Sequence, residues 1–240
     1  MAWQSSGASN TALIENLKRN GLIVSERVKK AMIRPPTEVH VPNYVRPLQV
    51  DRANYSPALP YEDSPQLIGH RATISAPHMH ADACEKLLSF LVPGAKVLDI
   101  GSGSGYLTHV FAELIKPGGK VIGVDHLQPL VNLATTNMAK SEDGRDMLRS
   151  GAVQFVKADG RQGFDVSKPY DAIHVGAAAS DHHQVLVAQL KAPGRLFMPV
   201  EEAGGQYIYV TDKKADGSLE RQKLYGVRYV PLTSEASDDM

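Results

Sequence analysis

The side chains best suited to chemistry lie together in one short polar window, GHRATISAPHMHADA, which contains Ser75, His78 and His80. A serine hydrolase would need its nucleophile on a G-x-S-x-G turn, and TISAP lacks both glycines. A metal site needs three or four converging ligands, but this pair of histidines supplies two without nearby acids on the same face. His182 and His183 could join them only if the fold brought the two segments together. The window therefore favours neither a covalent nucleophile nor a metal centre, and the predicted metal content is none.

The same window carries the signals of a helix start. Ser75 is predicted to be the N-cap, with Pro77 in the first turn. A capping serine leaves a hydroxyl and free backbone amides at a helix amino terminus, where they can bind a carboxylate. Cys84 falls within this helix and is predicted to be a core residue without a redox role. The residues expected to face the core are Met79, Ala83, Leu87 and Leu91.

A glycine loop, LDIGSGSGY, follows an apolar strand, at the position where open parallel sheets bind their ligands. The dinucleotide fingerprint G-x-G-x-x-G would require glycine where Tyr106 stands. The loop instead runs G-x-G-x-G from Gly101, with Asp99 two residues earlier. A carboxylate beside the turn would repel a pyrophosphate but attract an ammonium, which S-adenosylmethionine has. The close backbone approach that Gly101 and Gly103 allow suits the amino-acid portion of that methyl donor.

Two further acids follow strands. Asp125 ends VIGVD about 20 residues after the loop, the usual distance for an acid that binds both ribose hydroxyls. Asp159, in KADG, is predicted to accept a hydrogen bond from an adenine amino group. Each acid alone could be a strand-end cap or a surface charge. Three acids at three successive strand ends, Asp99 included, favour a nucleoside cofactor.

The elements that must position these residues alternate between apolar strands and amphipathic helices from residue 94 onward. The strands are AKVLDIG, GKVIGVDH, VQFVKADG, YDAIHVGAA and GRLFMPV, and the helices are YLTHVFAELI and QPLVNLATTNMAK. This alternation predicts a parallel sheet covered on both faces. QYIYVTD and KLYGVRYVPL flank the turn KADGS and predict an antiparallel hairpin. The predicted fold class is α/β: a doubly wound, mostly parallel, Rossmann-like sheet with an antiparallel C-terminal edge hairpin and N-terminal helices.

A single domain is predicted over residues 1–240. Residues 1–33 read as an N-terminal helical cap and 61–233 as the catalytic core, followed by an acidic tail at 234–240. The proline-rich insertion at 34–60 is predicted to be an extended surface excursion, because so many prolines oppose a helix.

Composition narrows the class of protein. Lysine plus arginine and aspartate plus glutamate balance at 26 each, so no net field draws the chain to nucleic acid or to a membrane surface. The chain has one cysteine, no secretory signal at the start, and no apolar segment near the roughly 18–20 residues that span a bilayer. These features predict a cytoplasmic protein.

Six segments together resemble one family. DSPQLIGHRATISAPHMHA, LDIGSGSGYLT, VIGVDH, DGRQG, PYDAIHVGAAA and GVRYVPLT are similar to protein-L-isoaspartate (D-aspartate) O-methyltransferases, and MAWQSSGAS resembles the eukaryotic members. The glycine loop is common to many methyltransferases, whereas TISAPHMHA and HVGAAA are more specific. The resemblance implies a monomeric repair enzyme that methylates the carboxylate of isoaspartyl residues in peptides and age-damaged proteins, yielding S-adenosyl-L-homocysteine. Activity toward D-aspartyl residues is left open.

The resemblance also assigns residues. It implies that Ser75 is the catalytic residue and that it lies beside the cofactor. Departures from the family pattern are the proline-rich block, Ser180 and Glu201, which bear on substrate-side loops more than on chemistry. The residues that the glycine loop and the resemblance together assign to the cofactor are Ala72, Thr73, Ile74, Ser75, His80, Asp99, Gly101, Ser104, Asp125, His126, Asp159, Gly160 and Thr233.

Methyl transfer from a sulfonium to a carboxylate is an in-line displacement, and the carboxylate is already ionised near neutral pH. Catalysis should come mainly from alignment, so Ser75 is predicted to position the substrate without bonding covalently to it. The rivals are a tRNA methyltransferase, against which the balanced charge argues, and a small-molecule carboxyl methyltransferase, against which TISAPHMHA argues. A non-enzymatic binding module is disfavoured by the intact set of acids and glycines.

Overall fold

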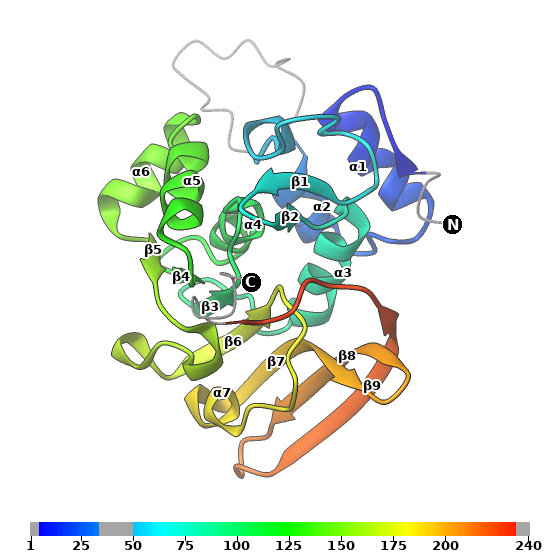
Figure 1. Cartoon of the computed structure of the whole chain (residues 1–240). Coiled ribbons are helices and arrows are strands. Elements are labelled where there is room, and N and C mark those ends of the chain that lie inside the picture. The colour runs from blue at the N-terminus through cyan, green and yellow to red at the C-terminus, as the bar shows by residue number, and fades with distance from the viewer. Residues whose placement is uncertain (1–4, 34–49, 234–240) are drawn as a thin grey trace.

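A seven-stranded sheet organises the chain. The computed structural model describes residues 5–33 and 50–233, and its main sheet has the order β5-β4-β3-β6-β7-β8-β9 (Figure 1). β3 lies between β4 and β6, so the chain order reverses around it, which is where doubly wound sheets bind ligands. The five parallel strands, all predicted from the sequence, are β3 (Lys96–Ile100), β4 (Lys120–Asp125), β5 (Val153–Lys157), β6 (Tyr170–Val175) and β7 (Leu190–Glu202).

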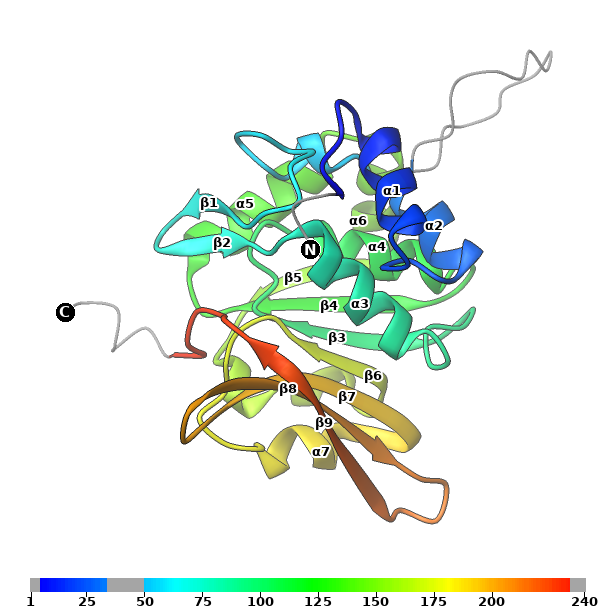
Figure 2. The ribbon, with the colours of Figure 1, turned by 90° about the vertical axis from the view of Figure 1, so that its right-hand side faces the viewer.

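The antiparallel edge is larger than the sequence indicated. The predicted hairpin is confirmed as β8 (Gly205–Lys213) paired with β9 (Leu219–Val227). β7 is also antiparallel to β8, in addition to its parallel pairing with β6. The N-terminal helices and this edge lie at opposite ends of the molecule (Figures 1 and 2).

Helices and apolar side chains cover both faces of the sheet. Along β3, Val97 belongs to one buried apolar cluster and Leu98 to the other, because successive strand residues point to opposite faces. The larger cluster includes side chains from most of the helices, and the smaller includes Leu186 and Val187 of α7. The helices after the N-terminal pair are α3 (Pro77–Leu87), α4 (Tyr106–Leu114), α5 (Gln128–Met138), α6 (Glu142–Ser150) and α7 (Gln184–Gln189). Cys84, on α3, is buried as predicted.

The N-terminal helices are α1 (Asn10–Arg19) and α2 (Glu26–Met32), whose N-caps are Ser9 and Ser25. They pack on the same side as α3 and α4 and contribute to the larger apolar cluster. Buried Asn10 links this pair to the next segment: its amide donates to the Met32 carbonyl at 2.8 Å, and its oxygen accepts from the Arg52 amide at 3.4 Å.

One prediction is wrong for part of the insertion: of its described residues, 50–60, only Pro57, Ala58 and Leu59 are exposed together at the surface. Residues 50–56 do not form an extended surface excursion, because Val50, Arg52 and Tyr55 are buried and η2 (Arg52–Asn54) is a 3-10 helix. The rest of the block, 34–49, and the acidic tail lie outside the described residues. A second, small sheet was not predicted: β1 (Gln66–Gly69) and β2 (Ala72–Ile74) form a hairpin directly before Ser75.

Candidate functional site

Two adjoining hollows lie where the parallel strands end. The strand-end hollow is lined by residues that follow β3, β4, β5 and β6 and by the C-terminal segment 230–233. The serine hollow adjoins it and is lined by Ser75 and His80, among others. The two hollows share Thr73, Gly101, Gly103 and Gly176. Every residue that the sequence assigned to the site, except Asp159, lines one or both hollows.

The glycine loop connects β3 to α4 and borders both hollows. Gly101 and Gly103 have φ values of 74° and 50°, a region that residues with a Cβ atom rarely adopt. The Gly101 amide donates to the Val124 carbonyl at 2.8 Å, and the Gly103 amide donates to Asp125 Oδ2 at 3.0 Å. The loop is therefore tied to the end of β4 and lies with its backbone against the hollows.

Asp125, the last residue of β4, is nearly buried in the strand-end hollow. Its Oδ1 accepts from the Leu127 amide at 3.3 Å and lies 3.3 Å from His126 Nδ1. Burial raises the pKa of this carboxyl, and the hydrogen bonds from the Gly103 and Leu127 amides oppose that rise. The contacts fix the orientation of the carboxylate and leave lone pairs for further donors.

Asp159 does not line either hollow, although the next residue, Gly160, lines the strand-end hollow. The Asp159 carboxylate accepts from the Arg161 amide at 3.0 Å and forms a bidentate pair with the Arg161 guanidinium. The hydrogen bond from the Arg161 side chain lowers the pKa of Asp159. The placement of this side chain therefore does not support the expected bond to an adenine amino group. Gly160, and not Asp159, lines the hollow in which the adenine would lie.

The C-terminal segment reaches the hollow by pairing with the residues that follow β6. The Ala178 amide donates to the Val230 carbonyl at 2.8 Å, and the Leu232 amide donates to the Ala178 carbonyl at 2.7 Å. This pairing places Val230, Leu232 and Thr233 in the wall of the strand-end hollow. In Figure 1 the segment runs from β9 back across the sheet toward the ends of β3 and β6.

Asp99 lines the serine hollow and is buried. Its Oδ2 accepts from Thr108 Oγ1 at 2.5 Å, and its Oδ1 lies 2.8 Å from His174 Nδ1. His174 lines the same hollow and was not among the residues assigned from the sequence. Two donors already bind the carboxylate, but each oxygen has a second lone pair for an ammonium.

The predicted cap at Ser75 is wrong. The N-cap of α3 is Ala76, and no side chain of the helix itself caps it. Buried Asp63 takes this role instead, because its Oδ1 accepts from the His78 amide at 3.0 Å and lies 2.8 Å from His78 Nδ1. That amide is therefore not free for a carboxylate, and His78 is held at Asp63, so it does not join His80 in a metal site.

Ser75 is held by residues from distant parts of the chain. The Arg52 Nη2 group donates to the Ser75 carbonyl at 2.9 Å, and the Tyr229 hydroxyl is hydrogen-bonded to the Ser75 side chain. Sequence reasoning missed both residues. Nothing local marks them, since Arg52 lies in the proline-rich block and Tyr229 follows the last strand.

The polar groups of the hollows fit S-adenosylmethionine. The Ser102 hydroxyl is buried in the serine hollow and has no hydrogen-bond partner among residues 5–33 and 50–233, and Asp99 and His80 lie in the same wall. An amino-acid group, with its ammonium and carboxylate, suits these donors and acceptors. The neighbouring strand-end hollow presents Asp125 to hydroxyl groups and apolar side chains such as Ile100 and Leu130 to a base.

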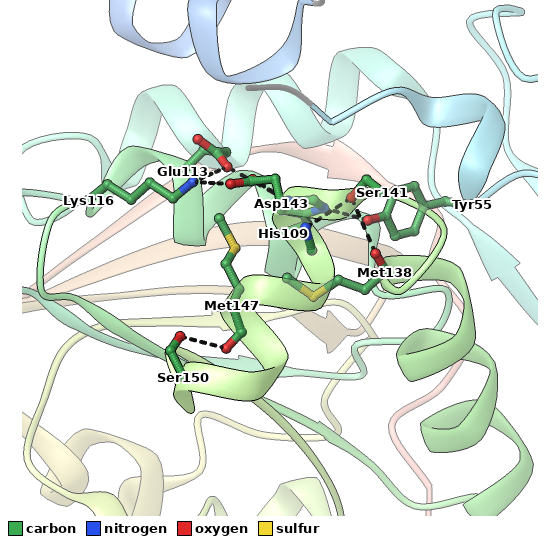
Figure 3. Close-up of polar contacts among 10 residues, drawn as sticks. Tyr55, His109, Glu113, Lys116, Met138, Ser141, Asp143, Met147 and Ser150 are labelled. Atoms are coloured by element: carbon green, nitrogen blue, oxygen red, sulfur yellow. Dashed lines mark hydrogen bonds and ion pairs between the residues drawn. The ribbon is translucent and has the colours of Figure 1, made fainter. Parts of the chain in front are cut away.

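A second polar cluster lies between α4 and α6, and we call it the α4–α6 cluster: His109, Glu113, Lys116 and Asp143 (Figure 3). His109 Nε2 lies 3.4 Å from Asp143 and 3.7 Å from Glu113. The three are the one set of possible metal ligands within residues 5–33 and 50–233. The Lys116 ammonium, however, lies between the two carboxylates at 2.7 and 2.9 Å and supplies a cation there.

Comparison with known proteins gives a consistent result. A family model described as protein-L-isoaspartate (D-aspartate) O-methyltransferase matches residues 8–237. The chain is 43% identical to a Caenorhabditis elegans protein-L-isoaspartate O-methyltransferase, over 98% of this chain and 96% of the relative, and 42% identical to one from Triticum aestivum, over 95% and 93%. A solved Plasmodium falciparum enzyme of that name, in complex with S-adenosyl-L-homocysteine, superposes with a TM-score of 0.83 at 32% identity and covers 95% of this chain and 100% of that one. None of the helices in the described ranges is both long enough and apolar enough to cross a membrane.

Proposed function

Because this chain belongs to the protein-L-isoaspartate (D-aspartate) O-methyltransferase family, we propose that its two hollows bind S-adenosylmethionine and the carboxylate that receives the methyl group. The protein is an S-adenosylmethionine-dependent protein carboxyl O-methyltransferase. It transfers a methyl group to the free carboxylate of L-isoaspartyl residues in damaged proteins and peptides.

The strand-end hollow is the proposed adenosine site. Asp125 accepts hydrogen bonds from both ribose hydroxyls, and its amide bonds to Gly103 and Leu127 keep it oriented for them. His126, Gly160 and Thr233 complete the wall around the nucleoside. Ala72 and Thr73 line the side of this hollow that faces the β1–β2 hairpin.

The serine hollow is the proposed site of the amino-acid group and of methyl transfer. Asp99 faces the ammonium, while Ser102, Ser104 and His80 offer donors to the carboxylate of the methyl donor. Bound S-adenosylmethionine supplies an electrophilic methyl group on a sulfonium. Ile74 and Ser75 lie in the same wall. The serine hydroxyl can donate a hydrogen bond to an incoming substrate carboxylate and so orient it.

Ser75 positions the nucleophile and does not act as one. The substrate carboxylate has an ordinary pKa of about 3.3–4 and is ionised at neutral pH, so no base is needed to activate it. Alignment of reacting groups can contribute roughly 7–11 kcal/mol in well-oriented cases. Arg52 on the Ser75 carbonyl and Tyr229 on its side chain restrict the serine and thereby support this role.

Substrate range and setting are also part of the proposal. The acceptors are isoaspartyl peptides and age-damaged proteins, and the enzyme works in the cytoplasm as a monomer without a nucleic-acid partner. The equal numbers of acidic and basic residues and the single, buried, unpaired cysteine support this view.

The observation that carries the proposal is that the glycine loop, Asp125 and Ser75 border two hollows that share one wall. An isoaspartyl residue carries its free carboxylate one methylene nearer the backbone than aspartate does. A site that fixes both the carboxylate and an extended backbone should therefore reject the normal isomer.

The test is transfer of a radiolabelled methyl group to four acceptors: an isoaspartyl peptide, the aspartyl peptide of the same sequence, free aspartate and bulk tRNA. Label should enter the isoaspartyl peptide. Comparable labelling of the aspartyl peptide, or preferred labelling of free aspartate or tRNA, would contradict the proposal and favour one of the rival methyltransferases.

A further inference from the structure

Arg52 is a fully buried arginine. Across residues 5–33 and 50–233, no acid lies within ion-pair distance of its guanidinium, whose Nε has no hydrogen-bond partner at all. The guanidinium stacks over the Tyr106 ring at 5.3 Å from the ring centre. Asp63 favours the charged form of Arg52 electrostatically but forms no ion pair with it, and a buried charge without such a pair costs folding free energy, so its position calls for a functional reason.

The two hydrogen-bonded groups of Arg52 both lead to the serine hollow. Nη2 donates to the Ser75 carbonyl at 2.9 Å, and Nη1 lies 3.2 Å from His80 Nδ1. Ser75 and His80 line the hollow, whereas Arg52 lies behind them and does not. The Asn10 side chain accepts from the Arg52 amide, so the N-terminal helices hold the arginine in place.

The contact with Arg52 determines the protonation state of His80. An arginine side chain can only donate, so His80 Nδ1 must accept and cannot carry a proton. The proton of the neutral ring then lies on Nε2. Burial, followed by the positive charge of Arg52, holds the pKa of His80 well below its usual range, so the ring stays neutral at physiological pH.

We propose that Arg52 is a positioning residue that holds His80 as its Nε2–H tautomer and fixes the Ser75 carbonyl, so that the serine hollow presents a permanent neutral donor and an oriented hydroxyl to a carboxylate. The inference rests on the proposed function for the identity of that carboxylate. It belongs either to the amino-acid group of the cofactor or to the isoaspartyl substrate.

The direct test is the tautomer of His80, observed by ¹⁵N-resolved NMR with the signal assigned through His80→Gln. Native protein should show the Nε2–H form without titration from pH 6 to 8.5. Arg52→Met keeps an unbranched apolar stem but removes the charge and the donors, so His80 should show mixed tautomers and begin to titrate as the pH falls.

Arg52→Lys keeps the charge and one donor and should restore the Nε2–H form in part. It also remains informative if Arg52→Met does not fold. The other titratable groups that interact with this pair are His78, His174, Asp63 and Tyr106, and none of them is altered in either variant.

Binding measurements identify the carboxylate. If the cofactor carboxylate is the ligand, Arg52→Met should weaken S-adenosyl-L-homocysteine binding at least fivefold but change methylthioadenosine binding, which lacks the amino-acid group, less than twofold. If the substrate carboxylate is the ligand, KM for the isoaspartyl peptide should rise at least fivefold while S-adenosyl-L-homocysteine binding holds. Either result supports the proposal.

Arg195→Met is the matched control. Arg195 also donates to a carbonyl, that of Lys86, and stacks over a ring, that of Phe90, but it lies on β7 and lines neither hollow. It should leave the His80 tautomer and both ligand affinities unchanged.

An unchanged His80 tautomer in folded Arg52→Met protein would overturn the proposal. Ligand affinities and peptide KM within twofold of the native values would do so too. These outcomes are distinct from a failure of the proposed function, which would appear as no methyl transfer by the native protein to isoaspartyl peptide.

Discussion

Two buried clusters of polar residues lie on the same side of the sheet. One contains a cation without a paired acid, and the other contains two acids that share one cation. Behind the serine hollow, Arg52 contacts His80 and Ser75 and, within residues 5–33 and 50–233, forms no ion pair with an acid. In the α4–α6 cluster, Glu113 and Asp143 share one cation, Lys116 (Figure 3).

Aromatic rings connect the two groups. The Tyr106 ring lies 5.0 Å from His80 and 5.5 Å from Tyr55, and the Tyr55 hydroxyl lies 2.5 Å from His109 Nδ1. The two groups differ in whether they border a hollow and in whether their charges are paired. The α4–α6 cluster has acids, a cation and a neutral histidine within itself and is interpreted as structural, whereas the group around Arg52 borders a hollow and, among residues 5–33 and 50–233, contains no acid in ion-pair contact with the arginine.

The largest expected effect is on cofactor affinity and comes from a residue of the strand-end hollow. Asp125→Ala removes the proposed bonds to two ribose hydroxyls, each worth on the order of 1.5–3 kcal/mol when the acceptor is charged. Calorimetry should show S-adenosylmethionine affinity reduced by a hundredfold or more. Asp165→Ala, which removes an exposed acid paired with Lys168, is the control and should bind normally. Unchanged affinity in Asp125→Ala would remove the adenosine assignment.

Ser75→Ala comes next. Loss of one hydrogen bond to a charged carboxylate should raise the activation free energy by about 1.5–3 kcal/mol and so lower kcat roughly 10- to 100-fold. Since Asp63 and not Ser75 caps α3, no cap is lost, and the free energy of unfolding should fall by only about 0.5–1.5 kcal/mol, for the bond to the Tyr229 hydroxyl. Ser75→Thr keeps the hydroxyl and should retain part of the rate. Detection of methylated Ser75 by mass spectrometry, after incubation with cofactor alone, would contradict positioning and indicate a covalent route.

On the structural side, Lys116→Met removes the only cation of the α4–α6 cluster. Two partly buried carboxylates then lose their shared donor, and the protein should unfold about 1–2 kcal/mol more easily, after allowance for the partial exposure of the lysine. Denaturant unfolding measures this loss, and kcat/KM of the folded protein should not change. Lys191→Met, which breaks a more exposed pair with Asp171, should cost less than half as much. A fall in kcat/KM at unchanged stability would show that the cluster serves catalysis.

The smallest effect, taken per pH unit, concerns pH. Burial, with Asp143 adding to it, raises the pKa of Glu113 to about 8, from an ordinary value near 4.5. A raised acid pKa means that the folded state holds a proton that the unfolded state releases, so the contribution of Glu113 to stability is greatest below pH 4.5 and falls as the pH rises toward 8. The expected slope is on the order of 0.5–1 kcal/mol per pH unit.

Asp143 acts in the opposite direction, below that window. Burial works against its ionisation, but hydrogen bonds from His109, Glu113 and Lys116 lower its pKa, so its contribution is present above pH 4 and is lost in acid. Glu113→Gln should remove the slope between pH 5 and 8, whereas Glu15→Gln, in a surface pair with Lys29, should keep it. An unchanged slope in Glu113→Gln would show that another group is responsible.

The parts of the site that could be predicted are those encoded locally. Gly101 directly follows β3 and Asp125 is the last residue of β4, so both lie at the carboxyl ends of strands. Each strand is recognisable from its own residues, and these two positions could therefore be predicted without knowledge of the rest of the chain. The parallel sheet and its terminal hairpin were predicted for the same reason.

Most of the parts that were missed depend on contacts between residues that are distant in the sequence. Ser75 has the sequence pattern of a cap, yet Asp63 is the residue that satisfies the α3 amide. Asp159 has the position of a ligand, yet Arg161, two residues later, binds its carboxylate. Arg52 lies in a proline-rich stretch that reads as surface, yet the N-terminal helices and Tyr106 bury it. The choices at Ser75 and Arg52 are not visible in a short window of sequence, whereas the pairing of Asp159 with Arg161 is local.

The most direct test of the account is a crystal structure of the protein with S-adenosyl-L-homocysteine and an isoaspartyl peptide. The ribose hydroxyls should bind Asp125, and the peptide carboxylate should accept a hydrogen bond from Ser75 Oγ, with Arg52 still on the Ser75 carbonyl and the α4–α6 cluster unchanged. A peptide carboxylate bound away from Ser75, or a cofactor outside the two hollows, would contradict it.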